Sequence, residues 1–231
     1  MKKLSVILSL FLLGFLNAQS IKYGVVANFH KGSTVNIHDK SKGNFGSGVG
    51  VFADFALVTN DIYDSAWLYF TPQLEFSMEG EKAQAWNDKV ASEQKYNNYY
   101  VAMPLYIKYY LKNHGYKSDI YFMFGPKLEF LASNKVDEAQ AISYAYTQGY
   151  SNSPQDIELG AKSLSSIGLG NEIAKFGYGV SFVTGVKVDD KVNVFIRFDR
   201  GLSKVYKDYS KYSTYNRFLA IGINYYIGET N

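Results

Sequence analysis

The sequence of 231 residues contains no cysteine, so it can build neither a disulfide framework nor a lipoprotein anchor. Histidine occurs only three times, which leaves little material for a metal centre. Acidic and basic residues nearly balance, with a formal net charge of +3, so nothing in the electrostatics favours nucleic acid as a partner. These absences exclude several classes of function and leave the hydrophobic pattern as the main source of information.

Long apolar runs are also missing, except at the N-terminus. Two lysines precede a charge-free run from Leu4 to Leu16, and the small residue Ala18 follows it. This is the pattern of a secretory signal peptide, and the run is too short for a spanning helix. We predict that residues 1–18 are a signal peptide cleaved after Ala18 and that residues 19–231 form one domain. A retained N-terminal anchor is the alternative.

Aromatic residues are abundant, with 21 tyrosines and 16 phenylalanines. Such residues favour β-strands and also gather at membrane interfaces. After the signal sequence, no apolar stretch approaches the ~20 residues of a transmembrane helix. The choice is therefore between a soluble periplasmic β-protein and an outer-membrane barrel.

Alternation decides between these two classes. In residues 120–131, every second residue from Ile120 to Phe130 is apolar or proline, whereas the intervening positions include Lys127 and Glu129. Because successive side chains of a strand point to opposite faces, one face of this segment suits lipid and the other a polar interior. Eight segments show this pattern: 21–29, 48–57, 67–79, 100–111, 120–131, 176–188, 192–198 and 219–227. The pattern is weaker in the first two.

The predicted connections alternate between long and short. The long ones are 30–45, 80–95, 133–175 and 203–213, and the short ones are 59–64, 113–117 and the Asp189–Asp190 hairpin. Bacterial outer-membrane barrels have long outer loops and short periplasmic turns, an asymmetry that a soluble sandwich does not need. We therefore predict an all-β fold, an eight-stranded antiparallel up-and-down transmembrane β-barrel with long extracellular loops and short periplasmic turns. Eight is the smallest strand number that closes such a barrel.

Three prolines fall inside the predicted strands: Pro72, Pro104 and Pro126. A proline cannot donate a ladder hydrogen bond, so it argues against a regular central strand. We predict that each one marks a local β-bulge that bends the wall.

Some segments carry more than alternation. They are GVGVFADFAL at 48–57, YFTPQLEFSMEG at 69–80, YYVAMPLYIKYYL at 99–111, YFMFGPKLEFLAS at 121–133, FGYGVSFVTGVKV at 176–188, VFIRFDRGLSKVY at 194–206 and NRFLAIGINYYIG at 216–228. In this order they resemble the PorT-like outer-membrane β-barrel family of the Bacteroidetes. The resemblance implies an outer-membrane barrel of a Gram-negative bacterium. One line of that family is tied to type IX secretion, so a role as an accessory of secretion or gliding is implied too.

Residues that carry chemistry are sparse. His30 and His38 fall in the first predicted outer loop and His114 in a periplasmic turn, where solvated positions are the simplest interpretation. No G-x-S-x-G motif is present, and Asp189 and Asp190 suit a turn. We predict no catalytic residue, no metal and no cofactor. A small lipid-modifying enzyme and a narrow solute pore remain as alternatives.

Charged side chains predicted to face the lumen are the most informative cluster. Those toward the outer half are Glu75, Lys127, Glu129, Arg197 and Asp199. Asp54 and Lys108 are predicted to face inward nearer the periplasm. Because eight strands enclose room for little except side chains, we expect the outer five to neutralise one another as a structural plug. The functional alternative is a selective pore or a proton path.

The expected protein is therefore a scaffold or binding protein of the outer membrane that is exported and crosses that membrane many times. The segment 133–175 is predicted as its functional surface, because it is far longer than ordinary connections and contains Tyr144, Tyr146 and Tyr150. Expected partners are outer-membrane lipid and lipopolysaccharide, the outer-membrane assembly machinery and secretion-system proteins.

Overall fold

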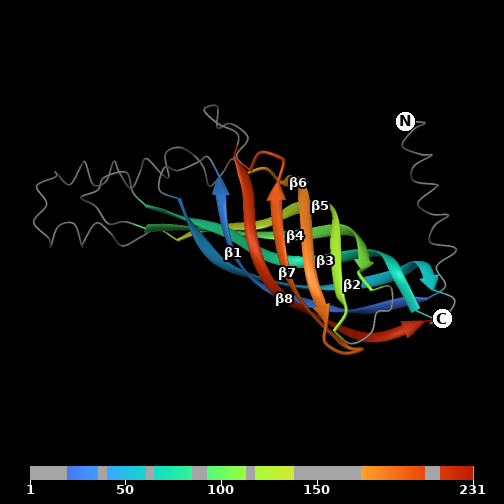
Figure 1. Ribbon diagram of the computed structural model, residues 1–231. Coiled ribbons are helices and arrows are strands. Elements are labelled where there is room, and N and C mark those ends of the chain that lie inside the picture. The colour runs from blue at the N-terminus through green and yellow to red at the C-terminus, as the bar shows by residue number, and fades with distance from the viewer. Residues whose placement is uncertain are drawn as a thin grey trace, which may run out of the picture.

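A computed structural model describes residues 20–35, 41–60, 65–84, 93–112, 118–137, 173–205 and 214–230. In these ranges each strand pairs antiparallel with the next, and the eight strands close into one barrel (Figure 1). The strands are β1 (Ile21–Val35), β2 (Ser41–Asn60), β3 (Ser65–Gln84), β4 (Glu93–Tyr110), β5 (Ile120–Asp137), β6 (Phe176–Lys187), β7 (Val192–Gly201) and β8 (Tyr215–Thr230). The predicted fold class is confirmed. Among the described residues, no helix is long and apolar enough to cross a membrane.

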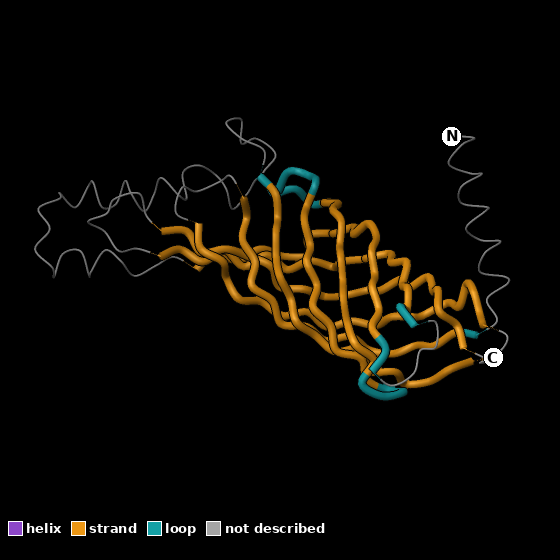
Figure 2. Tube along the Cα trace, in the orientation of Figure 1, coloured by secondary structure: helices purple, strands orange, loops and turns teal. Residues whose placement is uncertain are grey.

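The barrel closes where β8 meets β1. Their register runs from Ile21 opposite Thr230 to Val35 opposite Tyr215. The start of β1 and the end of β8 therefore lie at the same end of the barrel, and the tilted strands wrap round to join there (Figures 1 and 2). In outer-membrane barrels this end faces the periplasm, and the opposite end carries the longer loops.

Alternation along the strands is as predicted. On β7, Val194, Ile196 and Phe198 are exposed on the outer wall, with 43%, 51% and 42% of their surface accessible. Phe195 and Arg197 lie between them and are buried in the lumen. Apolar side chains exposed to hydrocarbon and polar ones enclosed inside are the arrangement that a membrane barrel requires.

Several strands run further toward the outer end than predicted. β1 continues to Val35 and β2 begins at Ser41, so the predicted loop 30–45 is mostly strand. β3 likewise reaches Gln84, and β5 reaches Asp137. Beyond the hydrocarbon layer a strand no longer needs apolar residues on its outer face. The alternation of apolar and polar residues therefore ends earlier along the strand than its backbone hydrogen bonds do.

The prediction that the three prolines mark bulges is wrong. Pro72 lies opposite Leu105, Pro104 opposite Lys127, and Pro126 opposite Val180, with no register shift at any of these positions. A proline removes only its own donor, so pairing resumes in the same register on either side.

Irregular pairing occurs instead near the periplasmic end of the β2–β3 pair. The register shifts between Ala56 and Thr59 of β2. This disturbs the alternation of β3. Trp67 shares the parity of the buried residues Tyr69 and Gln73, yet it packs edge-on against Tyr109 with ring centroids 5.6 Å apart. Tyr109 belongs to the outer face of β4, so this pair supplies aromatic side chains near the periplasmic interface.

The connection between β6 and β7 is longer than the predicted two-residue hairpin and comprises residues 188–191. The Asp189 carboxylate accepts hydrogen bonds from the backbone N–H groups of Lys191 at 2.8 Å and Val192 at 2.7 Å. Asp189 is thus the turn former that its residue type suggested.

Several predictions fall outside the described residues. They concern the signal peptide at 1–18, His38, the turn 113–117 with His114, and the tyrosines at 144, 146 and 150.

A glycine inside the wall offers a test of the fold. Gly185 lies opposite Tyr121, and a Cβ atom there would collide with the buried Tyr121 ring and with the Val194 carbonyl. We expect Gly185→Leu to lower the free energy of unfolding by about 1–3 kcal/mol, the usual cost of overpacking. Urea unfolding followed by the gel shift of the folded barrel would measure it.

Gly177→Ala is a milder comparison, because its added carbon would meet only side-chain atoms, the Ser203 hydroxyl at 3.1 Å and a Glu129 oxygen at 3.6 Å. Equal stability of Gly185→Leu and Gly177→Ala would contradict the packing of Tyr121 against β6.

Candidate functional site

The lumen is filled by side chains from all eight strands. Large aromatic residues occupy much of it, and Tyr106 and Tyr121 are completely buried. Tyr69 and Tyr100 also point into the lumen and are buried. Polar and charged residues occupy the space between these rings and form two clusters.

The outer cluster is organised around Lys127 of β5. Its ammonium nitrogen lies 3.0 Å from Glu79, 2.6 Å from Glu129 and 2.9 Å from Asp199. A lysine ammonium has three N–H donors, so three carboxylates match its full donor capacity. The carboxylates come from β3, β5 and β7, and Lys127 therefore ties three separate strands together across the lumen.

Arg197 of β7 is the second cation of this cluster. Its Nη1 lies 2.6 Å from Glu75, and its Nε lies 3.6 Å from Asp199. Asp199 also accepts a hydrogen bond from the Ser181 hydroxyl, and Ser181 in turn lies 2.7 Å from the Tyr106 hydroxyl. Since Ser181 has one proton and donates it to Asp199, Tyr106 is the donor to Ser181.

The structure brings together all five predicted lumen charges: Glu75, Lys127, Glu129, Arg197 and Asp199. The prediction missed Glu79, which completes the set around Lys127. A signal was present, because Glu79 shares the inward parity of Glu75 on the same strand. With Glu79 the cluster contains four carboxylates and two cations, so it is richer in acid than predicted.

His30 contradicts the prediction of a solvated outer loop. It is 2% exposed, and its Nε2 donates to the Met78 carbonyl oxygen at 2.8 Å. Its ring packs on Phe218 at 4.8 Å between centroids, and the Phe218 ring also lies 4.1 Å from the Lys127 nitrogen. The alternation of β1 continues past Phe29, which places His30 on the lumen face.

The second cluster lies nearer the periplasm and centres on Lys108. Its ammonium donates to Asp54 at 2.7 Å and to the Tyr226 hydroxyl at 2.6 Å, while Tyr226 donates to the same Asp54 oxygen at 2.7 Å. The rings within 4.9–5.8 Å of the Lys108 nitrogen belong to Tyr69, Tyr110, Tyr121 and Tyr226. The cation is thus enclosed by a carboxylate and aromatic faces, which bind it electrostatically.

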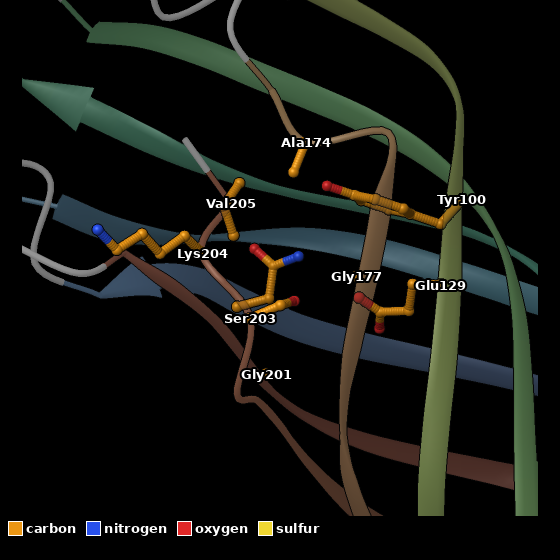
Figure 3. A pocket seen from close by; sticks show the side chains of 9 residues that line it. Tyr100, Glu129, Ala174, Gly177, Gly201, Ser203, Lys204 and Val205 are labelled. Carbon is orange, nitrogen blue, oxygen red and sulfur yellow. The ribbon is translucent and has the colours of Figure 1, made fainter. Parts of the chain in front are cut away.

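A small pocket lies near the outer mouth of the lumen. It has a volume of about 10 Å³ and lies between β4, β6 and the segment after β7 (Figure 3). The Tyr100 ring reaches across it toward Ala174, and the Glu129 carboxylate lies beside Gly177. This volume is at the lower limit for a single water, which needs roughly 10–15 Å³ of such space.

The buried charges of both clusters are held in ion pairs. Each buried cation has a carboxylate within hydrogen-bond distance, and the carboxylates link strands distant in the sequence. Within the described ranges, no group of three or more His, Cys, Asp or Glu side chains is placed to hold a metal ion.

The pairing of Arg197 can be tested through stability. Arg197→Met keeps much of the volume but leaves Glu75 and Asp199 without this cation. Breaking a buried pair from one side costs about 3–5 kcal/mol, so we expect a loss of that size in the free energy of unfolding. Urea titration of the barrel in detergent would measure it.

Lys191→Met is the matched control, because Lys191 is exposed in the turn before β7. We expect it to change stability by less than about 0.5 kcal/mol. Wild-type stability of Arg197→Met would mean that Arg197 does not neutralise the acids around it.

Known proteins are similar to this chain at two levels, solved structures and a family model. The chain resembles the crystal structures of the attachment invasion locus protein Ail of Yersinia pestis (7% identity, TM-score 0.40, 89% of this chain and 98% of that one) and OprG from Pseudomonas aeruginosa (11%, 0.41, 92% and 95%). A search among curated proteins gives no significant match. The family model described as "outer membrane protein beta-barrel domain" matches residues 17–207. The chain therefore belongs to this family of outer-membrane β-barrel proteins.

Proposed function

We propose that this barrel is a membrane-embedded scaffold or binding protein and that its lumen conducts no solute. The observation that carries the proposal is the network around Lys127 and Arg197, which crosses the lumen from β3 to β7. A conducting path would have to break these buried ion pairs or pass between close-packed rings. Both cost more than thermal energy supplies, since separating a buried pair costs several kcal/mol.

A catalytic role is disfavoured by the same contacts. A general acid, base or nucleophile must be free to meet a substrate, at least within one hydrogen-bond length. Lys108, Lys127 and Arg197 each have carboxylate partners, and the polar space at the outer mouth has a volume of only about 10 Å³. We therefore propose that the protein acts through binding and not through a reaction.

The proposal extends to how the protein reaches its place and what it meets there. Residues 1–18 act as a signal peptide cleaved after Ala18, and the assembly machinery of the outer membrane inserts the rest. The segments at 99–111 and 194–206 resemble the PorT-like family and support a place for the chain in that branch of outer-membrane barrels. That branch makes an accessory role in type IX secretion or gliding the first biological process to examine.

A narrow cation pore is the second candidate. The surplus of carboxylates over cations in the outer cluster supports it, because an acidic lumen attracts cations and repels anions.

Planar-bilayer recording separates these two candidates. We expect no steady conductance from the purified protein, because its lumen lacks a continuous path. A porin added afterwards to the same bilayer should conduct, which shows that the membrane accepts barrels. Recovery of the folded, gel-shifted protein from the bilayer lipid confirms its insertion. A stable cation-selective current would contradict the scaffold proposal and favour the pore.

The binding surface is proposed to lie in the long outer segment, Ser133–Lys175. Its first residues extend β5, and residues 138–172 lie outside the described ranges. Segments of this length are usually functional or disordered. Deleting residues 139–154 should leave the gel shift of the barrel unchanged but remove the phenotype that complementation restores to a gene-deletion strain. Full complementation by the trimmed protein would show that this segment is dispensable.

A further inference from the structure

Three cations face outward on neighbouring strands of the wall. They are Lys31 of β1, Arg200 of β7 and Arg217 of β8, and all three are exposed. Arg200 and Arg217 are direct cross-strand partners, and Lys31 lies opposite Leu219, two positions from Arg217. Figure 1 shows β7, β8 and β1 side by side, so the three charges share one face of the barrel.

These cations lie where the apolar wall ends. On each strand, the next outward residue toward the end with the chain termini is apolar. These residues are Phe29 on β1, Phe198 on β7 and Leu219 on β8, with 52%, 42% and 56% of their surface exposed. The step from apolar to cationic occurs on all three strands, toward the end opposite the chain termini. It therefore marks the interface between hydrocarbon and headgroups of the outer leaflet.

The cations border a groove in the wall with a volume of about 410 Å³. Its lining includes Phe198 and Leu219 at the apolar side and Ser33 beside the charges, and no carboxylate is among the described residues that line it. Within the described ranges, none of the three cations makes an ion pair with a protein side chain. Like charges directly opposite each other in a sheet destabilise it, so an anion held between Arg200 and Arg217 would relieve their repulsion.

We propose that this groove binds the phosphorylated headgroup of an outer-leaflet lipid, with the phosphate between Arg200 and Arg217 and the acyl chains along Phe198 and Leu219. Guanidinium groups match phosphate oxygens with paired hydrogen bonds, which an ammonium group does less well. The apolar side of the groove favours a lipid over a soluble anion, because a soluble anion has no acyl chain to contact Phe198 and Leu219. Lipopolysaccharide carries this headgroup chemistry.

The proposal refines the expected lipid partner and rests on the orientation adopted for the proposed function, with the long connections outside. The test uses purified full-length protein in a neutral detergent, titrated with diphosphoryl lipid A and followed by native mass spectrometry. We expect Arg200→Gln/Arg217→Gln to bind at least about tenfold more weakly than wild type, since two charge-assisted contacts are lost. Dephosphorylated lipid A should bind the wild type as weakly as diphosphoryl lipid A binds the double variant.

Lys112→Gln/Lys191→Gln is the matched control, because it removes two exposed cations from the opposite end of the barrel. It should bind diphosphoryl lipid A like wild type. Equal loss in both double variants would reduce the effect to net charge and overturn the site. Inorganic phosphate that competes at the same concentration as the lipid would also overturn it, in favour of a soluble-anion site.

Arg200→Lys/Arg217→Lys keeps the charge and should retain part of the affinity, and the gel shift of each variant verifies folding. Wild-type affinity in Arg200→Gln/Arg217→Gln refutes the proposal. None of these substitutions touches the lumen, so bilayer conductance stays an independent test of the proposed function.

Discussion

This structure depends on one constraint, that each backbone polar group in the membrane must find a hydrogen-bond partner. Hydrocarbon offers none, so every N–H and C=O group at membrane depth must pair with a neighbouring strand, and only a closed sheet has no edge. The pairing of β1 with β8 removes the last edge. Closure with eight strands then leaves an interior just wide enough for side chains. The narrowness of the lumen is therefore a consequence of closure, and it constrains every residue that points inward.

Inside such a lumen, charge and register are coupled. Lys127 meets carboxylates from three strands only because β3, β5 and β7 hold fixed heights relative to one another. A slip of β5 by one residue would turn Lys127 and Glu129 toward lipid, where a charge costs roughly 2–4 kcal/mol at the midplane. Replacing the whole network by apolar residues could be as stable, but it would discriminate less between registers. The buried charges thus penalise wrong pairings of strands.

Alternation made much of this predictable. It identified eight strands, their outer faces and the charges at 75, 127, 129, 197 and 199, because parity alone decides which side of a closed sheet a residue occupies. The prediction from alternation failed where a register shift interrupts the alternation of inward and outward residues, and where a strand continues beyond its last apolar outward residue. The register shift near Thr59 turned Trp67 outward, and His30 was missed because β1 continues beyond Phe29. Which acid meets which cation was also beyond reach, since the contact of Glu75 with Arg197 joins residues 122 positions apart.

The same parity explains why two arginines three residues apart on β7 have opposite surroundings. Arg197 points inward and is neutralised by acids of its own chain, so its charge contributes to the barrel and to nothing outside it. Arg200 points outward, opposite Arg217, and the described residues that line the groove beside it include no acid. With its interior closed as proposed, the protein meets its surroundings only through its wall and its rims. Within the described ranges, the charges without an acid partner are therefore the ones to examine for a partner, and on this wall they lie at the proposed height of the lipid phosphates.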